Sequence, residues 1–525
     1  MPLPEYGIEW PPKPFDQAQR EMRTWNAWYN GDTSLLEEIY RETNQSKGGW
    51  LGKNGDKSTP KTARFFWGRD NPASNQRIHV PAPADVSRTI ADLLFAQPPQ
   101  VVIGEDDAVG NRELSQKRMN KLFGEDDTMS CLLEAAELAS ALGGAYLRLW
   151  WDRSISDKVR IGQMPADSAI PTWRYDTLAA VTFWTIVRSE DDTVWRHLER
   201  HEPGRILHGL YEGDRGRLGR VVPLQDSAET EWAAGLVDEN GAILTGVPGL
   251  TATYIPNVRP NRKWRNTTGL AQLGRSDYDG LEPLFDALDE TQTSWLRDLD
   301  LGKARLFVDE TMLKSMGAGN GKSFDTERAI FTAVGAGLGS AASGGLGVMA
   351  NQFSIRWEEH SKTEAEILNA ILRGVGLSTS SFSENSLTAG VTQTATEVNS
   401  KDRLSERSRD KRIGYWKASL RPFTKTTVDL DNAVFGSGVQ LKDLPEVRFP
   451  IRPQQNPAEL ATNLATLRSV QLVSIEQGIR QQHPNWSSDD VNDEYDRIRA
   501  DEKVTAALTM GFGGEDDESE RELAF

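Results

Sequence analysis

The sequence SDYDGLEPLFDALDETQTSWLRDL spans residues 276–299 and has the pattern of a long amphipathic helix. About 20 residues at ~1.5 Å each make a rod on the order of 30 Å long, and Gly280 and Pro283 suit its first turn. Eight acids and one arginine lie between Asp277 and Asp300, so the polar side of the rod is strongly negative. Its apolar side consists of residues that recur at helical spacing: Leu281, Leu284, Phe285, Leu288, Trp295, Leu296 and Leu299.

The acids of this rod leave several roles open. Composition permits a site built from two carboxylates, or a divalent cation held by Asp and Glu, but no pair of acids stands out by its spacing. Most charge runs on helices are simply solvated. We therefore interpret Asp286, Asp289 and Glu290 first as a solvated acidic helix face.

Downstream of the rod, nine glycines between Gly317 and Gly347 indicate an irregular segment with strand-like pieces at 305–308 and 354–357. A helix is expected from Ser361 to about Arg373, followed by the polar stretch STSSFSENSLTAGVTQT from residue 378. Thr394 and Glu397 then have capping-box spacing and open a long helix that reaches Arg421, where Pro422 should stop or kink it.

This long helix contains an unusual excess of positive charge. Between Lys401 and Arg421 there are eight bases and three acids, in a chain whose net charge is −17. The favoured interpretation is pairing with the acidic rod, between helices or between subunits, and gripping of DNA is the less favoured alternative.

Upstream of the rod, the chain mixes helices and strands. Residues 1–80 are rich in Pro, Gly and Trp, with one clear amphipathic piece at 33–43. Short alternating runs separated by turn residues predict an antiparallel sheet from about 160 to 260. Between these regions we expect helices at 84–96 and 130–142, and strands at 101–103 and 145–151.

The C-terminal part is expected to be mainly helical. It contains a strand at 446–450, a helix from about Pro457, a capping box formed by Ser474 and Gln477, and a charged helix at 488–500. The final residues include EDDESERE and predict a disordered acidic tail.

Composition excludes several classes of protein. The chain has 525 residues with 77 acids and 60 bases, which argues against a protein that grips nucleic acid through a basic surface. Its single cysteine, Cys131, rules out an intramolecular disulfide framework and is expected in the core. The start of the chain lacks the pattern of a signal peptide, and the uncharged run 329–355 has too many glycines for a membrane helix.

Two motifs suggest chemistry and fail on spacing or context. GAGNGKS, residues 317–323, resembles a phosphate-binding loop, but its glycines are one residue too close together. His197 and His201 in HLERH lie on a predicted strand, where two rings on one face are about 13 Å apart, too far for one metal. We expect these histidines to be exposed, and we expect no cofactor and no metal site.

The order of the parts resembles the portal protein of tailed bacteriophages, of the siphophage type. The resemblance is carried by LLFAQPP at 93–99, LGGAYLRLWWD at 142–152, the rod at 276–299, QTATEVNS at 393–400, and the ending NPAEL, SIEQ and DEYDRIRADE. These motifs cover most of the chain from about 80 to 503. No single motif is diagnostic, and the collinear set is fairly specific.

The resemblance implies an α+β portal-type fold with a wing, a two-helix stem, a small α/β clip, a long wing helix after a tunnel loop, and a helical C-terminal crown. The implied segments are a loop-rich N-terminal arm at 1–80, a wing at 81–275, stem helices at 276–303 and 358–377 on either side of a clip at 304–357, a tunnel loop at 378–393, a long helix and wing return at 394–456, a crown at 457–510 and an acidic tail at 511–525.

The family's function is implied in the same way. Its members form a ring, usually of twelve subunits, at one capsid vertex of the virion, and are assembled in the host cytoplasm. Double-stranded DNA passes non-specifically through the ring during packaging and ejection. The implied partners are the large terminase, a head–tail adaptor, and the major capsid and scaffold proteins, with no membrane and no catalysis.

The expected site residues follow from this resemblance and from the charge of the chain. The stem acidic face comprises Asp286, Asp289 and Glu290. A conduit for a polyanion must avoid sticky bases, and the predicted tunnel loop has one acid and no base. The channel-lining residues expected in that loop are Ser380, Ser381, Phe382, Ser383, Glu384, Asn385 and Ser386.

Two other functional classes compete with the portal interpretation. A catalytic ATPase subunit of the packaging motor is the alternative, and the failed phosphate loop counts against it. A membrane-associated or tail protein is disfavoured by the lack of a spanning segment and by the two-helix-plus-loop arrangement.

Overall fold

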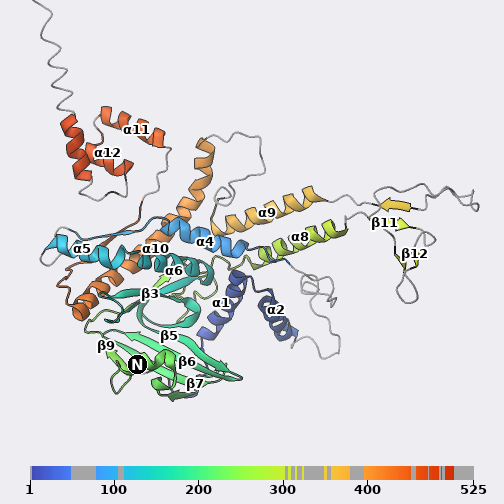
Figure 1. The fold of residues 1–525 in the computed structure, drawn as a ribbon, viewed down its shortest axis with the longest axis horizontal. Coiled ribbons are helices and arrows are strands. Elements are labelled where there is room, and N and C mark those ends of the chain that lie inside the picture. Colours follow the sequence, from blue (N-terminus) through green and yellow to red (C-terminus); the bar gives the residue numbers. More distant parts are fainter. Residues whose placement is uncertain are drawn as a thin grey trace, which may run out of the picture. The chain divides into compact units, whose positions relative to one another are not determined.

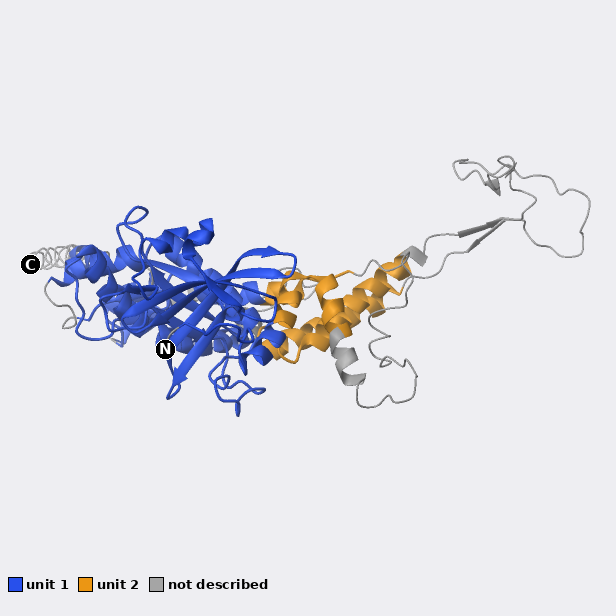
Figure 2. Cartoon of the chain, turned by 90° about the horizontal axis from the view of Figure 1, so that it is seen from below, with its two compact units in different colours: residues 1–22, 87–276, 380–525 blue, residues 23–86, 277–379 orange. Residues whose placement is uncertain are grey.

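The computed structural model describes residues 3–48, 78–104, 111–301, 305–308, 314–315, 322–323, 348–351, 356–378, 395–450, 457–470, 472–483, 486 and 491–501. The chain divides into two compact units (Figure 2). Unit 1 comprises residues 1–22, 87–276 and 380–525, and unit 2 comprises residues 23–86 and 277–379. This division places residues 23–86 in the same unit as the predicted stem helices.

Unit 1 contains a large antiparallel sheet, which confirms the prediction for residues 160–260 (Figure 1). Long alternating runs of β-branched and aromatic residues separated by tight turns favour such a sheet. A short 3-10 helix, η1 (Ala166–Ser168), precedes it, and η2 (Leu224–Asp226) and α7 (Ala228–Ala234) follow its last paired hairpin. Its strands in order are β4 (Ala169–Arg174), β5 (Thr177–Glu190), β6 (Thr193–Glu202), β7 (Arg205–Gly213) and β8 (Arg220–Val222), with β9 (Ala242–Leu244) also paired to β7.

A second antiparallel sheet has the order β10 (Ala252–Pro256), β2 (Gly144–Trp150), β3 (Arg160–Pro165). Helix α6 (Asp126–Leu142) leads directly into β2 through Gly143, whose φ of 89° lies in the left-handed region. A Cβ atom there would come 2.9 Å from the carbonyl oxygen of Gly274. Glycine is therefore required for both the conformation and the close approach.

The elements around this sheet correct and extend the sequence predictions. Helix α4 (Ala82–Phe95) and strand β1 (Gln100–Val102) lie within two residues of their predicted bounds, and β1 pairs with β15 (Glu446–Arg448). Helix α5 (Arg112–Phe123) was not predicted, because its composition is strongly polar and only its Met119, Leu122 and Phe123 bury apolar side chains.

Helix α10 (Ala395–Phe435) runs through Pro422, so the prediction that this proline stops the helix is wrong. Proline removes one backbone hydrogen bond, which costs stability in an isolated helix. Here the segment after it packs firmly into the core of unit 1 through Phe423, Val428 and Leu430, all at most 2% exposed. Tertiary burial outweighs the local penalty.

The N-terminal region is more helical than its composition suggested. Helix α2 (Thr33–Gly48) extends the predicted piece, and α1 (Phe15–Asn30) was missed. The apolar side of α1 is made largely of tryptophans, among them Trp25 and Trp28, which are at most 1% exposed. The prolines that precede α1 obscured this pattern in the sequence.

In unit 2, α8 (Glu282–Leu301) and α9 (Trp357–Val375) confirm the two predicted helices. Strand β11 (Arg305–Val308) matches its prediction and pairs with β14 (Val348–Asn351), while β12 (Lys314–Ser315) pairs with β13 (Lys322–Ser323). The strand predicted at 354–357 is wrong at Trp357, which begins α9. Residues 352–355 lie outside the described residues.

The C-terminal helices are α11 (Pro457–Ser469), α12 (Ile475–Gln482) and a helix at 491–501. The Ser474 hydroxyl caps α12 by accepting from the Gln477 backbone N–H at 3.2 Å, as its spacing predicted. The predicted acidic tail at 511–525 lies outside the described residues.

Candidate functional site

Helices α8 and α9 of unit 2 pack against each other along their apolar sides. Phe285 and Leu288 of α8 and Ile371 and Leu372 of α9 are at most 2% exposed. At Gly374 an added Cβ would lie 2.7 Å from a methyl carbon of Leu281. The two helices therefore meet at a glycine, which permits close approach.

A stripe of three acids on α8 is occupied by donors from the N-terminal region of the chain. Glu282, Asp286 and Asp289 are four and three residues apart, which places them on one helix face. The Trp25 indole N–H donates to Glu282 Oε1 at 3.1 Å, and the Tyr40 hydroxyl donates to Asp286 Oδ2 at 3.0 Å.

The third acid, Asp289, is held from two sides. Its Oδ2 lies 3.0 Å from His79 Nδ1, and its Oδ1 accepts the Val80 backbone N–H at 2.9 Å. The His79 ring also packs against Trp28, with ring centroids 5.8 Å apart. The stripe thus fastens residues 25–40 and 78–80 to the helix.

These contacts correct the interpretation of a solvated acidic face. Asp286, Asp289 and Glu290 are all half-buried. Asp286 and Asp289 accept hydrogen bonds from within the chain, while Glu290 makes a long one, 3.4 Å, from Ser294 Oγ. Burial, followed by the charge of Asp286, raises the pKa of the Tyr40 hydroxyl above its usual range, so the phenol stays a donor.

The donors of this stripe could not be found from spacing. Trp25, Tyr40 and His79 lie more than 200 residues from the acids they contact. The only signal in the sequence was the unusual aromatic content of a region that otherwise resembled a loop.

The far end of α8 carries a second charged cluster. Asp298 Oδ2 accepts from Arg356 Nη2 at 2.9 Å and lies 3.0 Å from His360 Nε2. Hydrogen bonds from His360 and then Arg356 lower the pKa of Asp298. The His360 ring stacks on Trp295 at 6.1 Å between centroids, so this cluster links the two helices.

The predicted tunnel-loop residues Ser380, Ser381, Phe382, Ser383, Glu384, Asn385 and Ser386 lie outside the described residues. Ser378, just before them, is buried at the end of α9. Their assignment to the channel stays a prediction.

The basic segment of α10 lies in unit 1 and bonds largely to backbone carbonyls. Arg409 donates to the carbonyls of Leu93 and Pro450, both at 2.7 Å. Arg421 donates to the Pro445 carbonyl at 3.1 Å, and the buried Arg412 donates to Asn257 Oδ1 at 3.1 Å. Part of the positive charge that stood out in the sequence therefore serves to hold the wing together.

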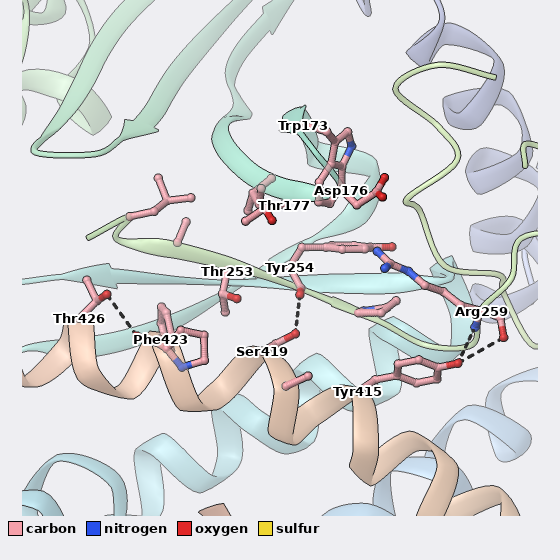
Figure 3. Close-up of a pocket in the computed structure, with 16 residues that line it drawn as sticks. Trp173, Asp176, Thr177, Thr253, Tyr254, Arg259, Tyr415, Ser419, Phe423 and Thr426 are labelled. Carbon is pink, nitrogen blue, oxygen red and sulfur yellow. Dashed lines mark hydrogen bonds between the residues drawn. The ribbon is translucent and has the colours of Figure 1, made fainter. Parts of the chain in front are cut away.

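A cavity of about 390 Å³ opens in unit 1 between α10, β10 and the β4–β5 turn (Figure 3). Tyr415 donates its hydroxyl to the Arg259 carbonyl at 3.2 Å, and Ser419 donates to the Tyr254 carbonyl at 2.8 Å. Trp173 and Asp176 form the opposite side. Arg259 Nε is buried and has no hydrogen-bond partner in the described part of the chain.

The prediction that His197 and His201 are exposed is wrong. Both are buried on β6, together with His208 on β7. His197 Nε2 lies 3.1 Å from His208 Nδ1, and His201 Nε2 lies 2.8 Å from Glu199 Oε1. The α7 residue Trp232 covers the His197–His208 pair, so a face that alternation alone left ambiguous became buried.

Burial lowers the pKa of His208 to about 4 and also lowers that of His197. Burial opposes ionisation of Glu199, but the Arg148 charge and the His201 hydrogen bond outweigh it and lower its pKa. Within the described residues, no group of three or more His, Cys, Asp or Glu side chains has a geometry suited to a metal ion.

Other features predicted from the sequence have mixed outcomes. Cys131 is only half-buried, and burial raises the pKa of its thiol to about 12. Lys322 and Ser323 of the GAGNGKS stretch form strand β13, whereas a phosphate-binding loop would place them at the start of a helix. Among the helices of the described residues, none has the length and apolar character to cross a membrane.

Comparisons with known proteins give one broad match. The family model described as phage portal protein, SPP1 Gp6-like, matches residues 15–506. A comparison with curated proteins found no match.

Three solved structures align with the chain. The virion of a native gene transfer agent (GTA) particle aligns with a TM-score of 0.40 and 11% identity, covering 84% of this chain and 98% of that chain. The neck of the native GTA particle, computed with C12 symmetry, has a TM-score of 0.34 and 13% identity over 84% and 98%. The neck of the empty GTA particle, computed with C6 symmetry, has a TM-score of 0.35 and 13% identity over 83% and 95%. These likenesses are too distant to carry an argument about function.

Proposed function

The chain belongs to the SPP1 Gp6-like family of phage portal proteins, and from this premise we propose that it forms a closed ring at one capsid vertex. The ring, of about twelve subunits, is the channel for DNA packaging and ejection. It also serves as the docking site for the terminase and the head–tail adaptor. The observation that carries this proposal is the family match over nearly the whole chain.

The charge of the chain supports a conduit. A net charge of −17 disfavours tight binding of a polyanion, because phosphate contacts need exposed bases and the release of counterions. A channel must let DNA slide, so a weakly adhesive lumen suits the task. We propose that residues 380–386 line this channel.

The alternative, an ATPase subunit of the packaging motor, has less support. Lys322 and Ser323 would have to open a helix in order to cradle phosphates, and they lie in a short strand instead. We propose a structural role without catalysis.

Native mass spectrometry of the purified chain, combined with electron microscopy, tests this function. We expect rings of about twelve copies, if necessary only in the presence of capsid or scaffold partners. A chain that stays monomeric across salt conditions and with these partners would contradict the ring, and ATP turnover that depends on Lys322 would favour the motor subunit.

A further inference from the structure

The cavity beside α10 is the strongest candidate for an unassigned contact, and its chemistry is cationic. Residues 259–265 contain four bases and no acid, and Arg259 of this loop lines the cavity. Between Lys401 and Arg421, α10 adds eight bases against three acids. Such a concentration of positive charge in a chain of net charge −17 favours an acidic occupant.

Two polar groups on the cavity wall fit an incoming peptide. Arg259 donates Nη2 to the Gln272 carbonyl, whereas its buried Nε lacks a partner among the described residues. Pro422 has no N–H to donate to the carbonyl of Ala418, one helical turn earlier, and both residues line the cavity. The first group suits a carboxylate, and the second suits a backbone or side-chain donor.

One carboxylate in the cavity wall needs a separate account. Asp176 lies on the turn between β4 and β5, and its Oδ1 accepts from Gln272 Nε2 at 2.7 Å. It is exposed at the rim, whereas the Arg259 Nε is buried. The bases of residues 259–265 outnumber it, so the local balance stays positive.

The acidic rod, which the sequence offered as the partner of these bases, is already engaged. Its acids Glu282, Asp286 and Asp289 accept hydrogen bonds from Trp25, Tyr40 and His79. Another acidic segment must therefore supply the charge.

The tip of the β5–β6 hairpin is such a segment. Strand β5 ends at Glu190 and β6 begins at Thr193, so Asp191 and Asp192 form a two-residue turn. Both are exposed, and in the described part of the chain no hydrogen bond or ion pair engages their carboxylates. A narrow, rigid turn with two free carboxylates suits a small cationic cavity.

We propose that the acidic tip formed by Glu190, Asp191 and Asp192 inserts into the Arg259 cavity of a second copy of the chain. The tip does not line the cavity of its own chain, so the contact is head-to-tail. Repeated around an axis, it leaves each copy with one tip engaged and one cavity filled. The inference rests on the proposed ring and names one of its interfaces.

A disulfide between copies tests the contact directly. Asp192→Cys on the tip and Ala418→Cys on the exposed cavity wall are combined in one chain. A disulfide forms only when the two Cα atoms approach within about 7 Å. Upon oxidation we expect a ladder of covalent oligomers that climbs beyond the dimer, because the contact is head-to-tail.

Three controls make the ladder specific. Each single variant should stop at the dimer or below, and the pair Glu239→Cys with Ala418→Cys, which starts from another exposed turn acid, should give no ladder. The native Cys131 thiol, whose pKa burial raises to about 12, should contribute little. No ladder from a chain that native mass spectrometry shows to be a ring overturns this inference and leaves the proposed function intact, whereas a monomeric chain contradicts the ring itself.

A second measurement keeps the wall of the cavity unchanged. The double variant Asp191→Asn, Asp192→Asn should weaken assembly at least tenfold and reduce its salt dependence, whereas Glu239→Gln, Asp443→Asn removes the same charge elsewhere and should not. Equal assembly of the two double variants contradicts the proposal. Duplex DNA binding that Arg259→Gln abolishes, without a disulfide ladder, would assign the cavity to phosphate instead.

Discussion

His79 Nδ1 lies 3.0 Å from Asp289 Oδ2, which joins two residues 210 positions apart in the sequence. Asp289 is thereby the end of an acidic stripe that receives Trp25, Tyr40 and His79 in turn. An acid that looked like part of a solvated surface instead fixes the N-terminal region against the helix. Removing it should therefore affect stability.

Asp289→Ala leaves the Val80 N–H and the His79 ring without their acceptor. Unsatisfied, half-buried donors cost about 1–3 kcal/mol, so we expect a loss of that size in the free energy of unfolding. Urea denaturation measures it. Glu290→Ala, at the neighbouring acid with only a 3.4 Å hydrogen bond from Ser294, should lose less than 1 kcal/mol, about what an exposed charge contributes. Equal losses in the two variants would show that the His79 contact contributes nothing.

The buried histidine pair predicts acid-sensitive stability of unit 1. Burial lowers the folded-state pKa of His208 to about 4, below its unfolded value near 6.5. Between these values the unfolded chain binds more protons, so stability falls as the pH drops from 6.5 to 4, by about 3 kcal/mol at most. Glu199, Arg148, His201 and His197 surround His208 and take part in the same titration.

Unfolding measured from pH 8 to pH 4 checks this prediction. His208→Gln should flatten the dependence over the window, and His483→Gln, at a half-buried histidine outside the sheet, should leave it unchanged. A variant at His208 with the full wild-type pH dependence would place the responsible group elsewhere.

A buried ion pair ties α5 to α10. Arg118 Nε and Nη2 donate to the two oxygens of Asp431 at 2.8 and 2.7 Å, and Asp431 is fully buried. Arg118→Met strands this carboxylate and should cost about 3–5 kcal/mol in the free energy of unfolding. The double variant Arg118→Met, Asp431→Leu should recover most of the loss.

The exposed pair of Lys121 and Asp157 gives the matched control for this experiment. Lys121→Met should change stability by less than about 1 kcal/mol, because water already screens that pair. A double variant no more stable than Arg118→Met alone would show that packing rather than the unpaired charge sets the cost.

The proposed channel loop gives a functional prediction. Ser383→Lys with Asn385→Lys adds two bases per subunit, which should retard passing phosphates and shorten the packaged DNA while the ring still assembles. The length of DNA per particle in a complementation assay measures the effect. Ser383→Gln with Asn385→Gln controls for size, and normal packaging by the lysine variant would remove this loop from the channel wall.

The sequence by itself predicted the order of the elements and the family they resemble. Periodic patterns located α8 and α9, the sheet of unit 1 and the cap at Ser474, because these features depend on residues close together in the chain. Predictions failed where distant contacts override local preference. Pro422 lies inside a helix because its flanks are buried, and the tryptophans of α1 gained their meaning only from what they pack against.

Tertiary structure alone decided which charges are free. Charge counting treated Asp286 and Asp289 as solvated and left His197 and His201 exposed, and folding buried all four to different degrees. It also left the turn at Asp191 and Asp192 without a partner and the Arg259 Nε without an acceptor. The physical reason is that a side chain's charge is written in the sequence, whereas its solvation depends on residues that may be 200 positions away, brought close only by the fold.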